Sequence, residues 1–117
     1  MKSYTDIEQS KKLAEILPIE SADMFYTSLN RDYPWIWIDK HLMEVDDIPC
    51  WSLTALLYIL REIAHSIDED ASVRVDSYKT VEWDLGIDNS DLELITESNP
   101  VDAAFKMIIR LKEQGVI

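Results

Sequence analysis

The sequence predicts an α+β fold in a single domain of residues 1–117, with the element order α-β-β-α-β-β-α. Two observations support this fold class. Apolar residues recur every three or four positions in three segments, and they alternate with polar residues in the segments between them. The length suits one domain, and no linker or internal repeat divides the chain. Because pairs of strands alternate with single helices, we expect an antiparallel sheet with the helices packed on one face.

The first helix is predicted to begin at Thr5 and to end before Pro18. Thr5 and Glu8 have the spacing of a capping box, in which the side chains of an N-cap residue and of the residue three positions later bind backbone N–H groups. Apolar residues follow with helical spacing from Ile7 to Leu17. Pro18 ends the pattern because it has no N–H to donate and its ring clashes with the preceding turn.

Two strands are predicted next, a short one over residues 24–28 and a clearer one over residues 33–38. If the isoleucines of the second strand enter the core, its aromatic side chains line the outer face and form a platform for a peptide or a small molecule. If the strand is covered on both faces, all six of its residues belong to the core. The alternating sets are Tyr33, Trp35 and Trp37 on one side and Pro34, Ile36 and Ile38 on the other.

The second helix is predicted from Leu53 to Ile67, with Ser52 as its expected cap. Its apolar face is expected to be buried and its polar face to be solvated. The apolar face consists of Leu53, Leu56, Leu57, Leu60, Ala64 and Ile67, and the polar face consists of Tyr58, Arg61, Glu62 and His65.

Cys50, the only cysteine, lies where a loop turns into this helix. A thiol at a helix N-terminus is a candidate nucleophile, because the backbone N–H groups there favour the thiolate. Such a cysteine also needs a base, and His65 lies about 20 Å away at the other end of the helix. His41 lies in a loop that the pattern does not place. With no second cysteine for redox chemistry, we interpret Cys50 as a packing residue and predict no catalytic residue.

A hairpin is predicted from the alternating segments 73–76 and 81–85, joined by a type I turn over residues 76–79. Its valines lie on one face together with Trp83 and Leu85, and this face is expected to be buried. The opposite face is acidic. Its candidate partner-binding residues are Asp76, Glu82 and Asp84.

The third helix has the clearest ends. Asn99 followed by Pro100 suits the N-cap and the first helical position, and Gly115 suits the exit. Asp102 lies in the first turn, where a negative charge is favourable. The apolar arc of this helix is wide, so we expect it to be wedged between other elements. The arc consists of Val101, Ala104, Phe105, Ile108 and Leu111.

The most unusual feature of the composition is the net charge, which is −12. Residues 68–102 hold 11 acidic residues against Arg74 and Lys79. Such a surface repels phosphate, so direct nucleic-acid binding through a basic patch is disfavoured. Three interpretations of the acidic surface stay open: a solvated surface that keeps the protein soluble, a site for a basic protein partner, and a mimic of nucleic-acid charge.

The sequence lacks the residue patterns that are typical of several classes of site. The two glycines form no phosphate-binding loop. The acidic stretch 84–95 fails the calcium-loop pattern, because its glycine is third instead of sixth and its twelfth residue is isoleucine. Two histidines and one cysteine at long spacing form no zinc motif, and we predict no cofactor and no metal. The sequence shows neither a signal-peptide pattern nor a membrane-spanning apolar run, so we expect a cytoplasmic protein without a membrane partner.

Three segments, ESADMFY, IPCWSLTALL and NPVDAAFKMIIRLKEQGVI, occur in this order along about half of the chain. Their order and intervals resemble those of uncharacterised small acidic proteins encoded on phages and mobile elements of gut anaerobes. The resemblance implies a genomic setting and no activity. The matching residues are Trp51, Ser52, Leu53, Ala55 and Leu56 in the second segment, and Val101, Asp102, Ala103, Met107, Ile108, Leu111 and Ile117 in the third.

The sequence therefore predicts a non-enzymatic accessory protein of a phage or mobile element, which binds a basic protein partner through its acidic face. One alternative is a binder of a small molecule or peptide that uses Trp35 and Trp37. The other is an acidic mimic of nucleic acid. The sequence predicts neither the identity of the partner nor the oligomeric state.

Overall fold

The computed structural model describes residues 2–36, 44, 46–67, 72–76, 80–84, 93–96 and 99–117, with the backbone alone for residues 67, 72–76, 80–84 and 93–96. The described residues form an α+β protein with three α-helices, as the sequence predicts. In chain order the elements are α1 (Ile7–Ala14), the 3-10 helix η1 (Ile19–Ser21), β1 (Met24–Tyr26), β2 (Trp35–Ile36), β3 (Ile48–Cys50), α2 (Leu53–Ile67), β4 (Ser72–Asp76), β5 (Thr80–Asp84), β6 (Glu93–Thr96) and α3 (Pro100–Glu113).

The described strands form two antiparallel sheets of three strands each, in the orders β2-β1-β3 and β4-β5-β6, where the sequence predicts one sheet. The strands missing from the prediction are β3 and β6. β3 is only three residues long, Ile-Pro-Cys, and has no polar residue to alternate with. β6 has the sequence Glu-Leu-Ile-Thr, in which the two apolar residues are adjacent. Both strands therefore form because they pair with a neighbouring strand, and neither has a local sequence pattern that predicts it.

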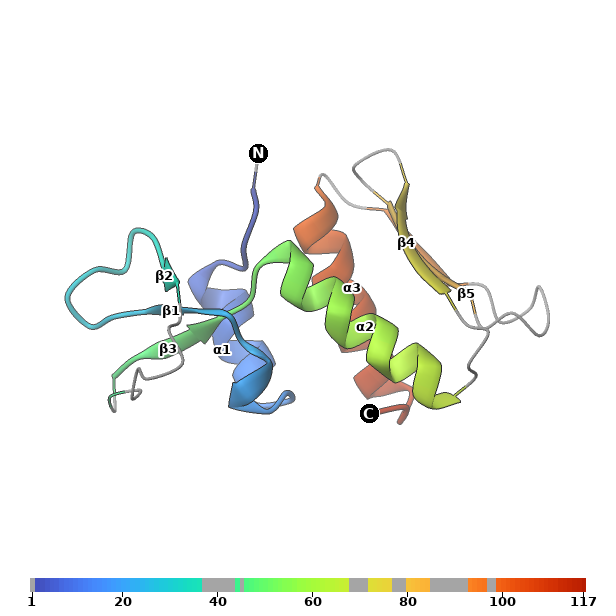
Figure 1. The fold of residues 1–117 in the computed structure, drawn as a ribbon, viewed down its shortest axis with the longest axis horizontal. Helices are drawn as coiled ribbons and strands as arrows, with labels where there is room; N and C mark the ends of the chain where they lie inside the picture. The colour runs from blue at the N-terminus through green and yellow to red at the C-terminus, as the bar shows by residue number, and fades with distance from the viewer. Residues whose placement is uncertain are drawn as a thin grey trace.

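α2 and α3 lie side by side in the middle of the molecule, between the two sheets (Figure 1). α2 packs on β4, and α3 packs on β5 and β6, so both helices cover the same face of that sheet. At the other side of the molecule, α1 packs on β3. The molecule is elongated, with principal extents of 48 × 27 × 23 Å. It is elongated because the two sheets extend in opposite directions from the central helices (Figure 1).

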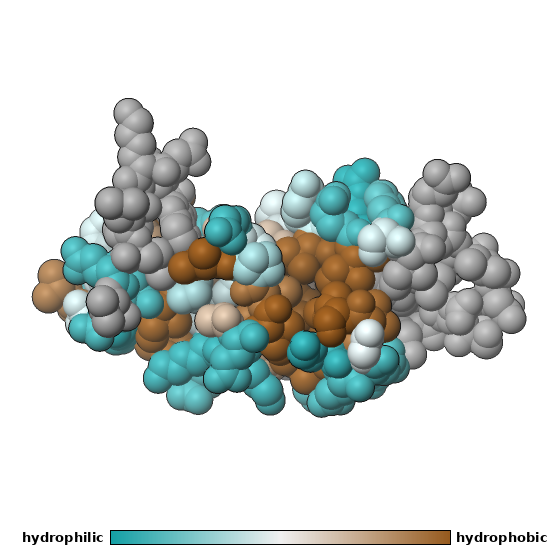
Figure 2. Space-filling model, turned by 90° about the horizontal axis from the view of Figure 1, so that it is seen from below, coloured by the Kyte–Doolittle hydropathy of each residue, from teal (hydrophilic) through white to brown (hydrophobic). Residues whose placement is uncertain are grey.

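The hydrophobic core joins all three α-helices. Leu13 of α1, Leu56 and Leu60 of α2, and Ile108 and Leu111 of α3 are buried in one cluster. These positions confirm the predicted apolar faces of the second and third helices. Apolar side chains also reach the surface over the middle of the molecule, where α2 and α3 lie, between hydrophilic margins (Figure 2). The residues predicted on the polar face of α2 are all exposed: Tyr58, Arg61, Glu62 and His65.

The N-cap of α1 lies one residue later than the sequence predicts, and the helix ends at Ala14, before the predicted end at Leu17. Asp6 is its N-cap, because Asp6 Oδ1 accepts a hydrogen bond from Gln9 N at 2.8 Å. The Gln9 side chain in turn accepts from Asp6 N at 3.1 Å. A capping box is therefore present, but Asp6 and Gln9 form it in place of Thr5 and Glu8. Thr5 is fully buried and bonds to other groups, which leaves Asp6 to cap the helix.

α2 begins where the sequence predicts. Asp23, the residue before β1, stabilises its first turn by hydrogen bonds to Ser52. Ser52 Oγ accepts a hydrogen bond from Ala55 N at 3.1 Å, which makes Ser52 the cap. The Asp23 carboxylate accepts from Ser52 N at 2.9 Å and also from the Ser52 hydroxyl. The cap is therefore fixed by a residue 29 positions earlier in the chain.

Both ends of α3 agree with the prediction. Asn99 Oδ1 accepts a hydrogen bond from Asp102 N at 2.9 Å and so caps the first turn. Gly115 has a φ of 77°, in the left-handed region that favours glycine. This conformation lets Val116 N donate to Leu111 O at 2.9 Å, as in a Schellman motif.

Candidate functional site

The N-terminal segment before α1 is paired with the segment that joins β3 to α2. Thr5 N donates to Trp51 O at 2.9 Å, and Leu53 N donates to Ser3 O at 3.0 Å. Tyr4 lies between these two bonds, in an isolated antiparallel bridge. The pairing holds this N-terminal segment beside the start of α2, where it becomes one wall of the site described below.

Thr5 is the centre of a buried group of polar side chains. Its hydroxyl lies 2.8 Å from Ser10 Oγ and accepts from Trp51 N at 3.2 Å. Its carbonyl accepts from the Tyr26 hydroxyl at 2.8 Å. Thr5 and Ser10 are fully buried, so these hydrogen bonds replace the contacts with water that both residues lose on folding. The group joins the N-terminal segment to α1 and β1.

Cys50 belongs to the same group, and none of its surface is exposed. Its Sγ donates to the Thr5 carbonyl at 3.4 Å. Burial raises the pKa of the Cys50 thiol, and the hydrogen bonds from Thr5 and Ser10 offset burial only in part. His65 is exposed near the far end of α2, and His41 lies outside the described residues. The burial of the thiol supports the prediction that Cys50 is a packing residue.

Lys2 joins the N-terminal segment to the first turns of α1 and α3. Its Nζ donates to Asp102 Oδ1 at 2.8 Å, to Gln9 Oε1 at 2.8 Å and to Asp6 Oδ2 at 3.1 Å. Burial alone would lower the pKa of Lys2, but its bonds to Asp102 and Asp6 outweigh burial and raise the pKa. Burial alone would raise the pKa of Asp102, but bonds from Lys2 and Gln9 hold the pKa below its usual value. The ammonium group of Lys2 is therefore paired with carboxylates of the protein itself.

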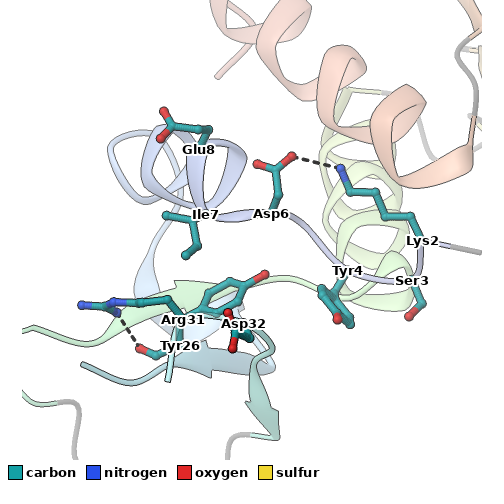
Figure 3. A pocket seen from close by; sticks show the side chains of 9 residues that line it. All are labelled: Lys2, Ser3, Tyr4, Asp6, Ile7, Glu8, Tyr26, Arg31 and Asp32. Carbon is teal, nitrogen blue, oxygen red and sulfur yellow. Dashed lines mark hydrogen bonds and ion pairs between the residues drawn. The ribbon is translucent and has the colours of Figure 1, made fainter. Parts of the chain in front are cut away.

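A pocket of about 580 Å³ opens between the N-terminal segment and the chain that follows β1. One wall comes from the N-terminal segment and the first turn of α1, and the other from Tyr26, Arg31 and Asp32. Lys2, Ser3 and Tyr4 lie toward one end of the lining, and Arg31 lies at the other (Figure 3). The volume is within the range of about 300–1,000 Å³ that is typical of ligand pockets.

The charged residues of this pocket differ in whether they have a partner within the protein. Arg31 donates to two backbone carbonyls, that of Tyr26 at 3.3 Å and that of Asp46 at 2.7 Å. The other cation of the lining is the lysine of the N-terminal segment, which already forms two ion pairs. Neither Glu8 nor Asp32 forms an ion pair within the described part of the chain. Glu8 points outward from the rim (Figure 3). Asp32 is therefore the one carboxylate of the lining that faces the pocket without an ion pair in the described part of the chain.

Four large apolar side chains are exposed in the same part of the chain, and we call them the apolar edge. Leu29 is 96% exposed, Tyr33 55%, Trp35 53% and Ile36 75%. Trp35 and Ile36 form β2, which is only two residues long and lies at the edge of its sheet. Ile36 does not enter the core, and neither aromatic residue is covered, so both predicted arrangements of this strand are wrong in part. Trp37 lies outside the described residues.

The predicted acidic-face residues Asp76, Glu82 and Asp84 lie in β4 and β5, where the structure describes the backbone. The register places Asp76 opposite Thr80, Glu82 opposite Arg74, and Asp84 opposite Ser72. The three acidic residues therefore occupy alternate positions of the hairpin, as predicted. β6 brings Leu94 opposite Glu82 from the other side, a neighbour that the prediction lacks. Residues 77–79 of the predicted turn lie outside the described residues.

The described part of the chain contains neither a metal-binding cluster nor a membrane-spanning helix. No group of three or more His, Cys, Asp or Glu side chains there is arranged to hold a metal ion. No helix there has both the length and the apolar character that crossing a membrane requires. The pocket and the apolar edge are thus the features on which a function is argued.

Sequence reasoning identified Trp35 but missed the pocket. Its lining combines residues from the first eight positions with Tyr26, Arg31 and Asp32, and no spacing or motif connects these two parts of the chain. Only the pairing of the N-terminal segment beside α2 brings them together.

The chain was also compared with known proteins. No family model matches it, and comparison with curated proteins and with solved structures finds no match either. The resemblance to small acidic phage proteins therefore stays a prediction, and the functional argument rests on the geometry of the pocket and the apolar edge.

Proposed function

We propose that this protein is a non-enzymatic interaction protein, which binds a partner-protein segment that contains apolar and basic side chains. The apolar edge carries the proposal. Its four residues lie within eight positions of the chain, and each is more than half exposed. Large apolar side chains gathered on a surface mark interaction sites, and Trp and Tyr are among the residues that contribute most to binding energy.

The backbone of β2 supports the same interpretation. β2 pairs with β1 on one side, and no other described strand pairs with it on the opposite side. An edge strand presents N–H and C=O groups to which a partner segment can add as a further strand, while alternate side chains provide selectivity. A partner that pairs there would cover Trp35 and Ile36 together.

The neighbouring pocket supports a preference for basic segments. Asp32 lies in the same loop as the apolar edge and lines the pocket. A lysine or arginine of the partner would find one carboxylate there, that of Asp32, which has no ion pair within the described residues. The ring of Tyr4, which also lines the pocket, adds a face for a cation.

A peptide library tests the proposal. The protein is immobilised, random displayed peptides are selected on it, and the enriched peptides are sequenced. We expect enrichment of Lys or Arg next to aromatic or aliphatic residues. The selected peptides are then titrated into the double variant Tyr33→Ser/Trp35→Ser, and we expect at least tenfold weaker binding, about 1.4 kcal/mol.

Tyr58→Ser is the matched control. Tyr58 is 62% exposed on α2, so its loss removes an exposed aromatic side chain away from the apolar edge. Equal weakening by both variants, or selected peptides without basic residues, would contradict the proposal.

The acidic hairpin is a second candidate site for a basic partner, favoured by the alternate positions of Asp76, Glu82 and Asp84 in the register. Here the expected binding is mainly electrostatic and weakens as salt rises. Glu82→Lys/Asp84→Lys should abolish binding of a basic peptide if this face is the site. Binding that survives this charge reversal but fails in the Tyr33→Ser/Trp35→Ser variant assigns the site to the apolar edge.

A further inference from the structure

The apolar edge is carried by a long loop. Leu29 and Tyr33 belong to residues 27–34, which join β1 to β2, and the other two residues of the apolar edge form β2 itself. Loops between paired antiparallel strands most often have about two to five residues, and this one is longer. Ordering a loop costs conformational entropy. Binding through the apolar edge is therefore stronger if the loop is already ordered before a partner arrives.

Arg31, in the middle of this loop, ties it to two strands. Its guanidinium group donates to Tyr26 O at 3.3 Å and to Asp46 O at 2.7 Å, and Figure 3 shows the first of these bonds. Tyr26 is the last residue of β1, and Asp46 lies two residues before β3. Because Tyr26 pairs with Ile48 of β3, both carbonyls lie at the same end of this pair of strands.

The residues on both sides of Arg31 are held by bonds within the loop. Asn30 N donates to Thr27 Oγ1 at 3.1 Å, and Asp32 N donates to Asn30 Oδ1 at 2.8 Å. Such side-chain bonds to the nearby backbone stabilise turns. Pro34 is buried, although the aromatic residues on either side of it are exposed. The loop is therefore fixed at its middle and at its end.

The segment that accepts the second bond is also closed by local hydrogen bonds. Asp47 N donates to Glu44 O at 3.0 Å, and Glu44 N donates to Asp47 Oδ2 at 2.9 Å. The carbonyl of Asp46 is therefore presented to Arg31 by a closed turn.

The positive charge of Arg31 does not explain its position. Arg31 lines the pocket that, in the proposed function, receives a lysine or arginine of the partner, and like charges repel each other. Arg31 forms no ion pair within the described residues, and its bonds go to backbone carbonyls. A guanidinium group presents several donors in one rigid fork and can reach two carbonyls at once, which a single ammonium nitrogen does less well.

We propose that Arg31 is a positioning residue of the binding site, which holds residues 27–34 against the ends of β1 and β3 and so keeps the apolar edge ready for a partner. This inference rests on the proposed function, because it assigns Arg31 a role in that same site. It predicts that loss of Arg31 weakens the binding of a basic segment, although a repelling charge is removed. A role through charge alone predicts the opposite, tighter binding.

Two variants of Arg31 test the sign of this effect. Basic peptides selected on the unmodified protein are titrated into Arg31→Gln, which removes the charge, and into Arg31→Lys, which keeps the charge without the fork. We expect both variants to bind about tenfold more weakly. Arg61→Gln removes the same charge at an exposed position of α2 and should change binding less than twofold.

The order of the loop is measured in the free protein, without any peptide. The heteronuclear NOE of the backbone amides in isotopically labelled protein reports motion on the picosecond to nanosecond timescale. We expect the NOE values of residues 27–33 to fall in both Arg31 variants and to stay unchanged in Arg61→Gln. Unchanged amide signals of α3 would show that the rest of the fold is intact.

Tighter or unchanged binding by Arg31→Gln would overturn the inference and leave the proposed function standing. Unchanged NOE values of the loop in both Arg31 variants would also overturn it, whatever the peptides show. The proposed function fails by a different result, which is unweakened binding by the Tyr33→Ser/Trp35→Ser variant.

Discussion

At the scale of single residues, Thr5 shows how one buried polar side chain can hold several segments of a fold together. Its hydroxyl and carbonyl are bonded to groups from α1, β1 and the segment before α2. All these groups are buried or nearly so, and an unpaired buried polar group costs more free energy than its hydrogen bond contributes. The same bonds take Thr5 out of the N-cap position that its sequence suggests.

Thr5→Val keeps the shape of the side chain and removes its hydroxyl. We expect the free energy of unfolding in urea to fall by about 1–3 kcal/mol, because Trp51 N and Ser10 Oγ lose their partner. Thr54→Val makes the same change at an exposed position of α2 and should stay within about 0.5 kcal/mol of the unmodified protein. Equal effects of the two substitutions would show that the Thr5 hydroxyl contributes nothing.

Cys50 is the other residue whose role depends on burial. In the native protein we expect its thiol to react with a thiol reagent far more slowly than in urea, because it is inaccessible and its pKa is raised by burial. Cys50→Ala should lower the free energy of unfolding by about 1 kcal/mol or somewhat more. Rapid labelling of folded protein near neutral pH would contradict the packing role.

At the scale of elements, the ends of the helices follow from local chemistry. Asp6, Ser52 and Asn99 each accept a hydrogen bond from the backbone of the first turn that follows. The C-terminal end of α3 depends on one backbone angle, the positive φ of Gly115. A β-carbon added to Gly115 would meet no other atom within 4 Å, so any cost of a substitution there comes from the backbone alone.

Gly115→Ala tests this exit. We expect the substitution to lower the free energy of unfolding by about 1–2 kcal/mol, because alanine in the left-handed region brings its Cβ close to the following carbonyl oxygen. Gln114→Ala, one residue earlier, has a helical backbone conformation and should have little effect. Thermal unfolding followed by circular dichroism measures both. A loss no greater for Gly115→Ala than for Gln114→Ala would contradict the argument.

At the scale of the whole molecule, one network connects the N-terminus, α1 and α3. Lys2 is paired with Asp6, the N-cap of α1, and with Asp102 in the first turn of α3. Gln9 Nε2 also donates to Asp102 Oδ1 at 2.8 Å. These bonds hold the N-terminal segment in the position that forms the pocket. The pocket therefore depends on the contacts that join the N-terminal segment to α1 and α3.

Acid titration tests this network. Because the pKa of Asp102 is lower in the folded protein than its usual value, its carboxylate stabilises the fold above the unfolded pKa, about 3.9. That contribution declines as the pH falls below this value and through the folded pKa. Asp102→Asn should therefore be less stable than the unmodified protein at pH 7, by up to about 1 kcal/mol.

The difference between the two proteins should shrink as the pH falls below about 4. Urea unfolding at a series of pH values from neutral to acidic measures it. Glu20→Gln removes an exposed carboxylate and serves as the control. A difference that stayed constant with pH would mean that the carboxylate charge of Asp102 does not contribute.

Local patterns in the sequence were sufficient for some features. The apolar faces of α2 and α3 repeat with the period of the helix, and Asn99 and Gly115 act on groups within a few residues of themselves. The alternate positions of Asp76, Glu82 and Asp84 follow from the period of a strand, and the register of β4 with β5 agrees. In each case the interacting groups are close in sequence, so the pattern contains the information.

The sequence by itself determined the fold class, the three helices with their buried faces, and the hairpin of β4 and β5, because these depend on periodicity and on local hydrogen bonds. Only the tertiary structure decided whether Thr5 or Asp6 caps α1, since each has a suitable partner three residues later and burial selects between them. It also decided that Trp35 and Ile36 are both exposed, because a strand of that composition is covered or bare according to its place in the sheet. The pocket likewise arises from contacts between segments far apart in the chain, and no local pattern encodes which segments will meet.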